Sequence, residues 1–137
     1  MFEVVYYSMC GNTKKVAEAI AVELGVKAEN IKTKKELAQE SLVFLGSGCY
    51  GYKPGRRVLQ FIAKNNFKGR QVALFGTSGS GEGKEVQAME ELLKPAGALI
   101  RGSFYCKGRS FLLLNRRHPT NEELAKAREF AKEMKKL

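Results

Sequence analysis

The sequence predicts an α/β fold: a doubly wound, five-stranded parallel sheet with helices on both faces. Short apolar runs alternate with segments whose apolar residues recur at helical spacing. This alternation implies right-handed crossovers between parallel strands. Most of the strand-like runs are nearly continuous in apolar residues, as expected for strands covered on both faces. Glycine-rich loops follow three of these runs, and parallel pairing would bring the loops to one edge of the sheet.

The five expected strands differ in strength. The first, third and fourth are strongly apolar, which favours central positions in the sheet. The second is short and carries a lysine, which is typical of an edge strand because the charge discourages pairing with another sheet. The strands are expected at residues 2–7, 31–33, 41–46, 71–76 and 98–105.

Four helices are expected to cover the sheet. The first runs from Thr13 to Leu24 and ends before Gly25, which favours the left-handed C-cap conformation. Thr120 and Glu123 have the spacing of a capping box before the last helix. The apolar residues expected to face inward in the four helices are, in chain order, Val16, Ala17, Ile20, Ala21 and Leu24; Val58, Phe61 and Ile62; Val86, Met89, Leu92 and Leu93; and Leu124, Ala127, Ala131 and Met134.

Length and composition limit the class of protein. A chain of 137 residues with 44% hydrophobic and 28% charged residues predicts one globular domain, residues 1–137. No apolar run has the length of a bilayer span, so we expect no membrane span. Met1 leads directly into the first strand, so no signal peptide is expected. Three cysteines without paired short spacing favour a reducing cytoplasm.

The charge is strongly basic. Lys and Arg number 24 against 14 acidic residues, all of them Glu, for a formal charge of +10. The absence of Asp excludes the response-regulator receiver domain, which has a similar fold but needs an Asp to accept phosphate, and removes most magnesium sites. The charge would raise encounter rates with acidic proteins, nucleic acid or anionic membranes, or it serves only to solvate helix faces.

The loop from Ser8 to Thr13 joins the first strand to the first helix. Its backbone N–H groups lie at the positive end of the helix dipole, where a phosphate is favoured. Hydroxyls at Ser8 and Thr13 and the amide of Asn12 add possible donors, and Gly11 allows a close approach of the backbone. The sequence therefore predicts a phosphate site here; an ordinary N-capped turn is the alternative.

Three other motifs fail in this sequence. The segment from Gly46 to Gly51 matches G-x-G-x-x-G, but it does not open into a helix and lacks the acidic residue about 20 positions on. Gly83-Lys84 lacks the first glycine and the hydroxyl of a phosphate-loop NTPase. Cys10 lacks the arginine and the aspartic acid that a low-molecular-weight tyrosine phosphatase uses, since Val16 stands at the arginine position and the chain has no Asp.

Several segments together match one known family. The loop Ser8–Thr13, the Gly-x-x-x-aromatic-Gly segment Gly46–Gly51, the segment Phe75–Gly79 and the start of the last helix at His118–Thr120 resemble the corresponding parts of short-chain flavodoxins. The resemblance covers nearly the whole chain and implies strand order 2-1-3-4-5. Flavodoxin itself exemplifies the rule that ligands bind at the switch point of such a sheet, with FMN as its ligand.

The resemblance implies an electron carrier that binds FMN non-covalently, with no catalytic residue and no metal. Tyr50 would stack on the inner flavin face, and the Gly51 region would offer a backbone group to flavin N5. The phosphate would be held by Ser8, Met9, Cys10, Gly11, Asn12 and Thr13, and the ring would be surrounded by Gly48, Cys49, Tyr50, Gly51, Thr77, Ser78 and Gly79.

Two departures from the family pattern bear on the partners. Glu82 stands where many members carry an aromatic on the outer flavin face, and Tyr52 or Tyr105 would have to substitute.

The basic charge predicts an acidic redox partner protein rather than nucleic acid. It does not indicate an oligomeric state. It also predicts a less negative potential for the last reduction step, since nearby carboxylates cost about 1 to 4 kcal/mol per close pair. The residues expected to dock the partner are Lys53, Arg56, Arg57, Lys107 and Arg109.

Two other functions stay open at this stage. One is an FMN-dependent oxidoreductase of the same fold, of the quinone or porphyrinogen oxidase type; the other is a non-redox binding module with a basic surface. His118 is expected to be a loop residue before a helix rather than a base. The three cysteines are expected to be buried and unreactive; alternatively, Cys10 and Cys49 face each other across the flavin site and can be oxidised.

Overall fold

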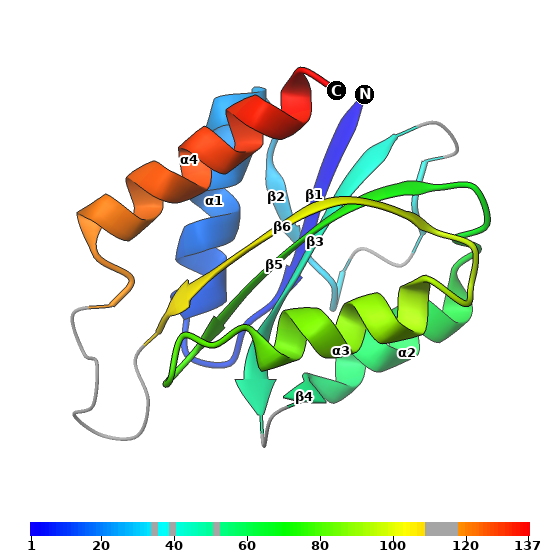
Figure 1. Cartoon of the computed structure of the whole chain (residues 1–137), viewed down its shortest axis with the longest axis horizontal. Helices are drawn as coiled ribbons and strands as arrows, with labels where there is room; N and C mark the ends of the chain where they lie inside the picture. Colours follow the sequence, from blue (N-terminus) through cyan, green and yellow to red (C-terminus); the bar gives the residue numbers. More distant parts are fainter. Residues whose placement is uncertain (34–35, 39–40, 51–52, 109–117) are drawn as a thin grey trace.

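The computed structural model describes residues 1–33, 36–38, 41–50, 53–108 and 118–137. Strands and helices alternate along the chain as expected (Figure 1). The elements are β1 (Phe2–Tyr7), α1 (Asn12–Leu24), β2 (Ala28–Asn30), β3 (Leu42–Tyr50), β4 (Lys53–Pro54), α2 (Arg56–Lys64), β5 (Gln71–Ser78), α3 (Lys84–Leu93), β6 (Leu99–Lys107) and α4 (Asn121–Lys135).

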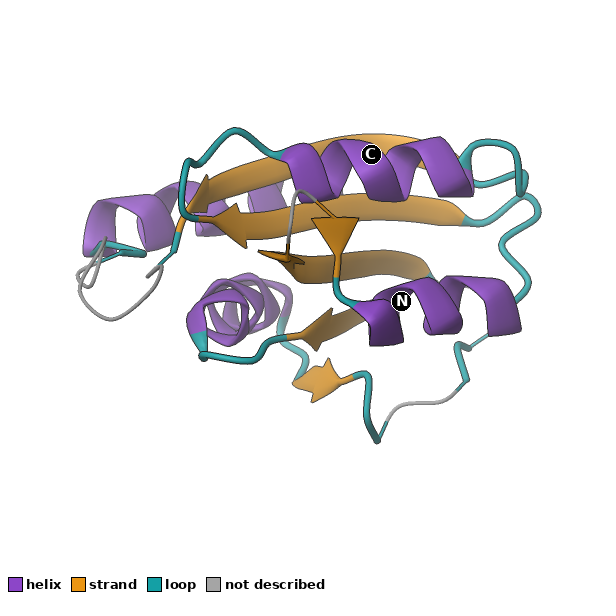
Figure 2. Ribbon diagram, turned by 90° about the horizontal axis from the view of Figure 1, so that it is seen from below, coloured by secondary structure: helices purple, strands orange, loops and turns teal. Residues whose placement is uncertain are grey.

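The sheet has the predicted topology. Five parallel strands follow the order β2-β1-β3-β5-β6, which is 2-1-3-4-5 when only the predicted strands are numbered. The two-residue strand β4 was not predicted and pairs antiparallel with the end of β3. Helices α1 and α4 lie on one face of the sheet and α2 and α3 on the other (Figure 2). Within the described part of the chain, no helix combines the length and apolar character needed to cross a bilayer.

The second strand lies three residues earlier than expected. Residues Ala28–Asn30 pair with β1, and the predicted strand at 31–33 is a turn in which Thr33 N–H donates to the Asn30 carbonyl at 3.0 Å. The prediction placed the strand around the apolar residue Ile31. The Ile31 side chain is indeed buried, but the chain turns immediately after it. At a sheet edge, backbone pairing rather than apolar side chains decides where the strand lies.

Three strands continue further at their carboxyl ends than expected. The structure extends β3 to Tyr50, β5 to Ser78 and β6 to Lys107. The predicted strands ended where small polar residues and glycines begin, but their backbones keep pairing in parallel register, for example Gly48 with Thr77. Part of the expected loop sequence is therefore held rigidly in the sheet.

The core consists of two apolar layers, one on each face of the sheet. Successive strand residues alternate between them, as the pleat requires: Phe44 packs toward α1 and α4, and Leu45 toward α2 and α3. The inward face of α3 differs from the expected one. Leu92 is 46% exposed, whereas Glu85 is fully buried and takes an inward position one turn before Met89.

Gly46 allows the two central strands to pack around a large ring. A Cβ at this position would lie 2.0 Å from the ring of Phe75, a fully buried residue on the neighbouring strand β5. Phe75 therefore occupies the space in which a side chain of residue 46 would sit, and only glycine leaves that space free.

Replacing Gly46 by alanine tests this contact. We expect the free energy of unfolding to fall by about 1–3 kcal/mol, the cost of overpacking a filled core, measured by urea denaturation. Gly102→Ala in β6 is the control, because its Cβ would meet the flexible end of Met134 at 2.9 Å and would approach a ring, that of Phe130, only to 3.4 Å. An equal loss in both variants would contradict the role of Phe75.

Candidate functional site

A pocket lies at the carboxyl ends of β1, β3 and β5, the switch point of the sheet. Its volume is about 290 Å³. The lining residues are Ser8, Cys10, Asn12, Thr13, Gly48, Cys49, Tyr50, Thr77, Ser78, Gly79 and Gly108. The structure thus brings together most of the predicted site residues.

Two predicted site residues do not line the pocket, and one wall residue was not predicted. Met9 and Gly11 lie in the first loop but are not in the wall. The predicted residue Gly51 lies outside the described residues. Gly108 follows β6 and lies close to Asn12 and Thr77. Gly108 was not predicted because no sequence motif surrounds it. Its position after a predicted strand, which ends at the same edge of the sheet, could have indicated it.

The first loop has the backbone geometry of an anion site. Gly11 adopts the left-handed conformation, with φ 87°, at the N-cap of α1, and no side chain caps this helix end. Its N–H donates to Ser8 Oγ at 2.9 Å, which folds the loop back on itself. Because the Ser8 oxygen is the acceptor, its hydroxyl hydrogen stays available to donate. The loop therefore offers donors at the positive end of the helix dipole.

A buried hydroxyl pair ties the first loop to β5. Thr13 Oγ1 and Thr77 Oγ1 lie 2.8 Å apart, and both side chains are buried. One hydroxyl donates to the other, so one hydrogen of the pair stays available. Gly108 N–H donates to the Ser78 carbonyl at 2.9 Å and thereby holds the end of β6 against the same strand.

Tyr50 crosses from the end of β3 to the first loop. Its hydroxyl oxygen accepts a hydrogen bond from Met9 N–H at 3.1 Å. Its ring contacts Tyr7 edge to face, with centroids 6.1 Å apart. A Cβ on Gly48 would lie 2.7 Å from the Tyr50 hydroxyl, so the ring lies over Gly48. Burial raises the pKa of Tyr50, only partly offset by the Met9 hydrogen bond.

The three cysteines lie in different environments. Cys106 is buried as expected, and burial, followed by the charges of Glu123 and Glu85, raises its pKa to about 12. Cys10 is exposed, so the prediction of a buried thiol is wrong there: the loop places it at the mouth of the pocket. Cys49 is partly buried and lines the same pocket. Their oxidation stays a prediction.

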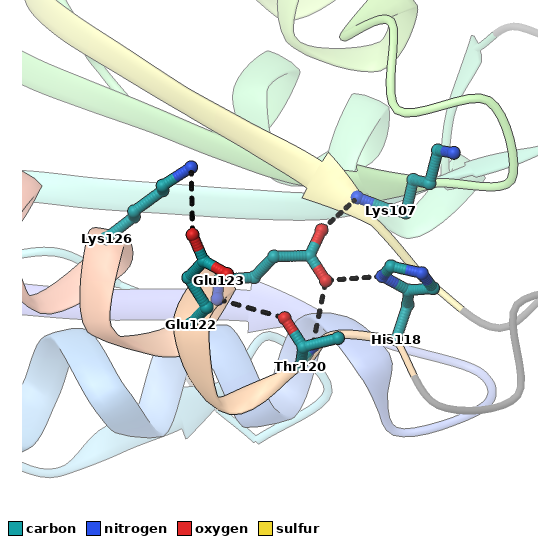
Figure 3. Close-up of polar contacts among 6 residues, drawn as sticks. All are labelled: Lys107, His118, Thr120, Glu122, Glu123 and Lys126. Atoms are coloured by element: carbon teal, nitrogen blue, oxygen red, sulfur yellow. Dashed lines mark hydrogen bonds and ion pairs between the residues drawn. The ribbon is translucent and has the colours of Figure 1, made fainter.

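His118 is a loop residue before α4, as expected, and is held by Glu123 (Figure 3). His118 Nδ1 lies 2.5 Å from Glu123 Oε1, which also accepts from Thr120 N–H at 2.8 Å. Glu123 N–H donates to Thr120 Oγ1, completing the predicted capping box. Lys107 N–H donates to Glu123 Oε2, which ties the end of β6 to α4.

Hydrogen bonding sets the ionisation of Glu123. Partial burial alone would raise its pKa, but hydrogen bonds from the Thr120 amide, His118 and the Lys107 amide lower it. The ionised carboxylate therefore acts as a clamp between β6 and α4. None of these residues lines the pocket described above.

The chain is similar to known proteins along most of its length. Residues 3–116 match the profile of the "Flavodoxin domain" family. The flavodoxin of Clostridium beijerinckii is 34% identical over 113 residues, covering 72% of this chain and 79% of that protein. Uncharacterized protein MJ0298 of Methanocaldococcus jannaschii is 32% identical over 136 residues, covering 91% of each.

A solved structure supports the fold. The structure of a flavodoxin from the domain Archaea superposes on this chain with a TM-score of 0.78, over 97% of this chain and 94% of that one, at 23% identity. At this identity the likeness shows the shared architecture and carries no information about individual site residues.

Glu123→Ala tests the clamp between β6 and α4. We expect a loss of about 1–2 kcal/mol in the free energy of unfolding at neutral pH, as for loss of a helix cap. A lowered pKa means that the stabilisation is present above the unfolded-state pKa and is lost as pH falls through the folded-state value. The difference from wild type, measured by denaturation over a pH series, should therefore shrink toward acid pH.

Glu122→Ala is the matched control, because that carboxylate is 82% exposed and its Nζ–O distance to Lys126 is 3.9 Å. We expect little change from this exposed pair. A loss for E123A that stays constant with pH would show that Glu123 stabilises the fold without its charge.

Proposed function

The chain belongs to the flavodoxin family, and from this premise we propose that it binds one FMN non-covalently in the pocket at the ends of β1, β3 and β5 and carries electrons between protein partners. The observation that carries the proposal is the convergence of the three loops on one pocket at the switch point of the sheet. The phosphate-holding and ring-surrounding roles of the predicted site residues belong to this proposal.

The donors around the pocket fit a phosphate held without an ion pair. The described lining residues include no Lys, Arg, Asp or Glu, and none is a histidine. They do include hydroxyls of Ser8, Thr13 and Thr77 close to the N-terminus of α1. A phosphate there would be stabilised by hydrogen bonds and by the helix dipole.

The pocket also fits a ligand that stays partly exposed. Its volume of about 290 Å³ lies just below the range of small-molecule sites, which is roughly 300–1,000 Å³. The bound flavin would supply the redox chemistry, and the protein would bind, orient and partly shield it. An exposed edge is what transfer of electrons to another protein requires.

The wall favours an electron carrier over an enzyme. Among its described residues the ionisable groups are two cysteines and Tyr50, and burial raises the Tyr50 pKa, so that it stays protonated at neutral pH. His118, the single histidine of the chain, is bound to Glu123 and does not line this pocket. No group in the described wall is therefore placed to act as a general base for a substrate.

Basic residues lie on elements next to the pocket and support docking of an acidic redox protein: Lys53 pairs with Tyr50 and Lys107 with Ser78, both in the pocket wall. Lys53, Arg56, Arg57 and Lys107 are exposed on β4, the first turn of α2 and the end of β6, while Arg109 lies outside the described residues. Complementary charge would steer such a partner toward the exposed edge of the cofactor.

A second hollow extends this basic surface. It has a volume of about 360 Å³ along α2, and its wall includes Lys32, Arg57 and Lys64 against the single carboxylate of Glu36. Lys32 Nζ lies 5.8 Å from the ring centroid of Tyr7, whose ring in turn contacts Tyr50. The hollow is thus connected through Tyr7 to the proposed cofactor site, and we assign it to the same acidic partner.

Titration of the cofactor-free protein with FMN tests the proposed function. We expect one FMN per chain, with quenched flavin fluorescence and a shifted visible spectrum. Riboflavin, which lacks the phosphate, should bind at least about tenfold more weakly, because it cannot form the charge-assisted hydrogen bonds. A protein that stays colourless would contradict the proposal and favour a non-redox binding module. Turnover of a quinone or porphyrinogen without any protein partner would favour an oxidoreductase.

Tyr50→Phe tests whether the tyrosine hydroxyl competes with the phosphate. Its bond to Met9 N–H must break if that amide binds the phosphate. The variant keeps the ring and removes the bond, so we expect FMN affinity to rise about threefold to tenfold, the value of one ordinary hydrogen bond. Tyr50→Ala is the comparison and should weaken binding, because it removes the stacking surface. Unchanged affinity in Y50F would show that Met9 N–H takes no part.

A further inference from the structure

Glu85 is a buried carboxyl without a strong partner. It is the second residue of α3, it faces the sheet, and its exposed fraction is 0%. Neither carboxyl oxygen has a hydrogen-bond partner of normal geometry among the described residues. Such a group costs stability unless it serves another purpose, because an unpaired buried polar group keeps its full desolvation penalty.

The carboxyl lies directly behind the wall of the proposed FMN pocket. It rests on Gly76, where a Cβ would lie 2.2 Å from Glu85 Oε1. Gly76 is followed in β5 by Thr77 and Ser78, which line the pocket. On the neighbouring strand, the Cys49 thiol lines the pocket and also acts on Glu85 as a weak donor. One backbone segment and one thiol therefore separate the carboxyl from the pocket.

The balance of forces leaves Glu85 able to change its charge near neutral pH. Burial raises its pKa to about 7, offset in part by its own backbone N–H and by the Cys49 thiol. It makes no ion pair within the described part of the chain. The titratable and charged side chains on the neighbouring elements are Cys49 and Tyr50 on β3, Lys53 on β4, Arg56, Arg57 and Lys64 on α2, Lys84, Glu90 and Glu91 on α3, and Arg101, Tyr105, Cys106 and Lys107 on β6. Of the groups on that list, Cys49 and Cys106 are coupled to Glu85.

We propose that Glu85 is a proton-exchanging group that couples the charge in the FMN pocket to pH. This inference rests on the proposed function. An ionised Glu85 disfavours added negative charge in the pocket by Coulomb repulsion, which is weakly screened because the carboxyl is buried. When one electron enters the pocket from the redox donor, one proton from solvent binds to a Glu85 carboxylate oxygen, and the net charge of this region stays constant.

Glu85→Gln tests the coupling, because it keeps the shape of the side chain and removes the titration. Glu91→Gln is the matched control: it removes the same charge from an exposed position six residues later in the same helix. All three proteins are loaded with FMN, and the potential of the last one-electron reduction is measured over a pH series. Any protonation of the flavin itself is common to the three and cancels in the comparison.

We expect the wild type and E91Q to share one pH dependence and E85Q to have a shallower one. The quantity compared is the ratio of the affinity for the reduced cofactor to the affinity for the oxidised cofactor. From about pH 6 to about pH 8 this ratio should fall roughly tenfold more in wild type than in E85Q, which is the effect of one pKa unit. Equal pH dependence in wild type and E85Q would overturn the inference and leave the proposed function intact.

A second readout needs no cofactor. A raised pKa means that the folded state binds the proton more tightly, so wild-type stability should fall relative to E85Q as pH rises from the unfolded-state value through about 7. Unfolding of the FMN-free proteins measures this and also shows that E85Q folds. An unchanged stability difference over this range would mean that Glu85 does not titrate, which overturns the inference. If none of the three proteins binds FMN, the proposed function fails, and the coupling fails with it.

Discussion

The parallel register of β1, β3 and β5 is the constraint on which the pocket depends. Tyr7 pairs with Ser47 and Ser47 with Gly76, so the three strands run side by side to the same edge of the sheet, and β3 and β5 continue past the end of β1. The loop after β1 therefore meets the last residues of β3 and β5, which line the pocket with it. The Thr13–Thr77 hydroxyl pair adds a second constraint, because it joins the start of α1 to β5 inside the protein. The donors of the first loop are thus fixed before any ligand arrives, which reduces the entropy cost of binding.

The fold and most of the pocket were predictable because they follow from repetition and order. Alternating apolar runs set the sheet, and the rule that parallel strands share an edge placed the first, second and third loops together. Features set by contacts between distant residues were not predictable. The Tyr50–Met9 hydrogen bond joins residues 41 positions apart, and Gly108 reaches the pocket only because β6 pairs with β5. Leu92 was expected to face inward but is exposed, whereas Glu85 is buried. The apolar pattern could not predict this, because it assigns inward positions only to apolar residues.

Under the proposed function, four roles fall to separate groups of residues: holding the phosphate, attracting the partner, fixing the fold and responding to pH. The described pocket wall has no Lys, Arg, Asp or Glu, so the proposed phosphate would be held by hydrogen bonds and by the helix dipole. The exposed basic residues are not part of this wall, and they would act on the rate of partner encounter. The carboxylate of Glu123, which is ionised by its hydrogen bonds, fixes β6 to α4 away from the pocket. Among the described residues, Glu85 is the buried carboxylate, and it lies behind the wall.

The basic surface and Glu85 act on the pocket in opposite directions, and their ranges decide which one prevails. Exposed Lys and Arg are screened by salt beyond about 8–10 Å at physiological ionic strength, so the formal charge of +10 acts on the pocket mainly through its nearest members. A buried carboxylate is screened much less, and one such charge can outweigh several exposed ones. Under the proposed coupling, the prediction that the basic charge makes the potential less negative would hold where Glu85 is protonated. Above the Glu85 pKa the nearer, buried charge would oppose the surface charge, and the potential would then depend on pH more than on net charge.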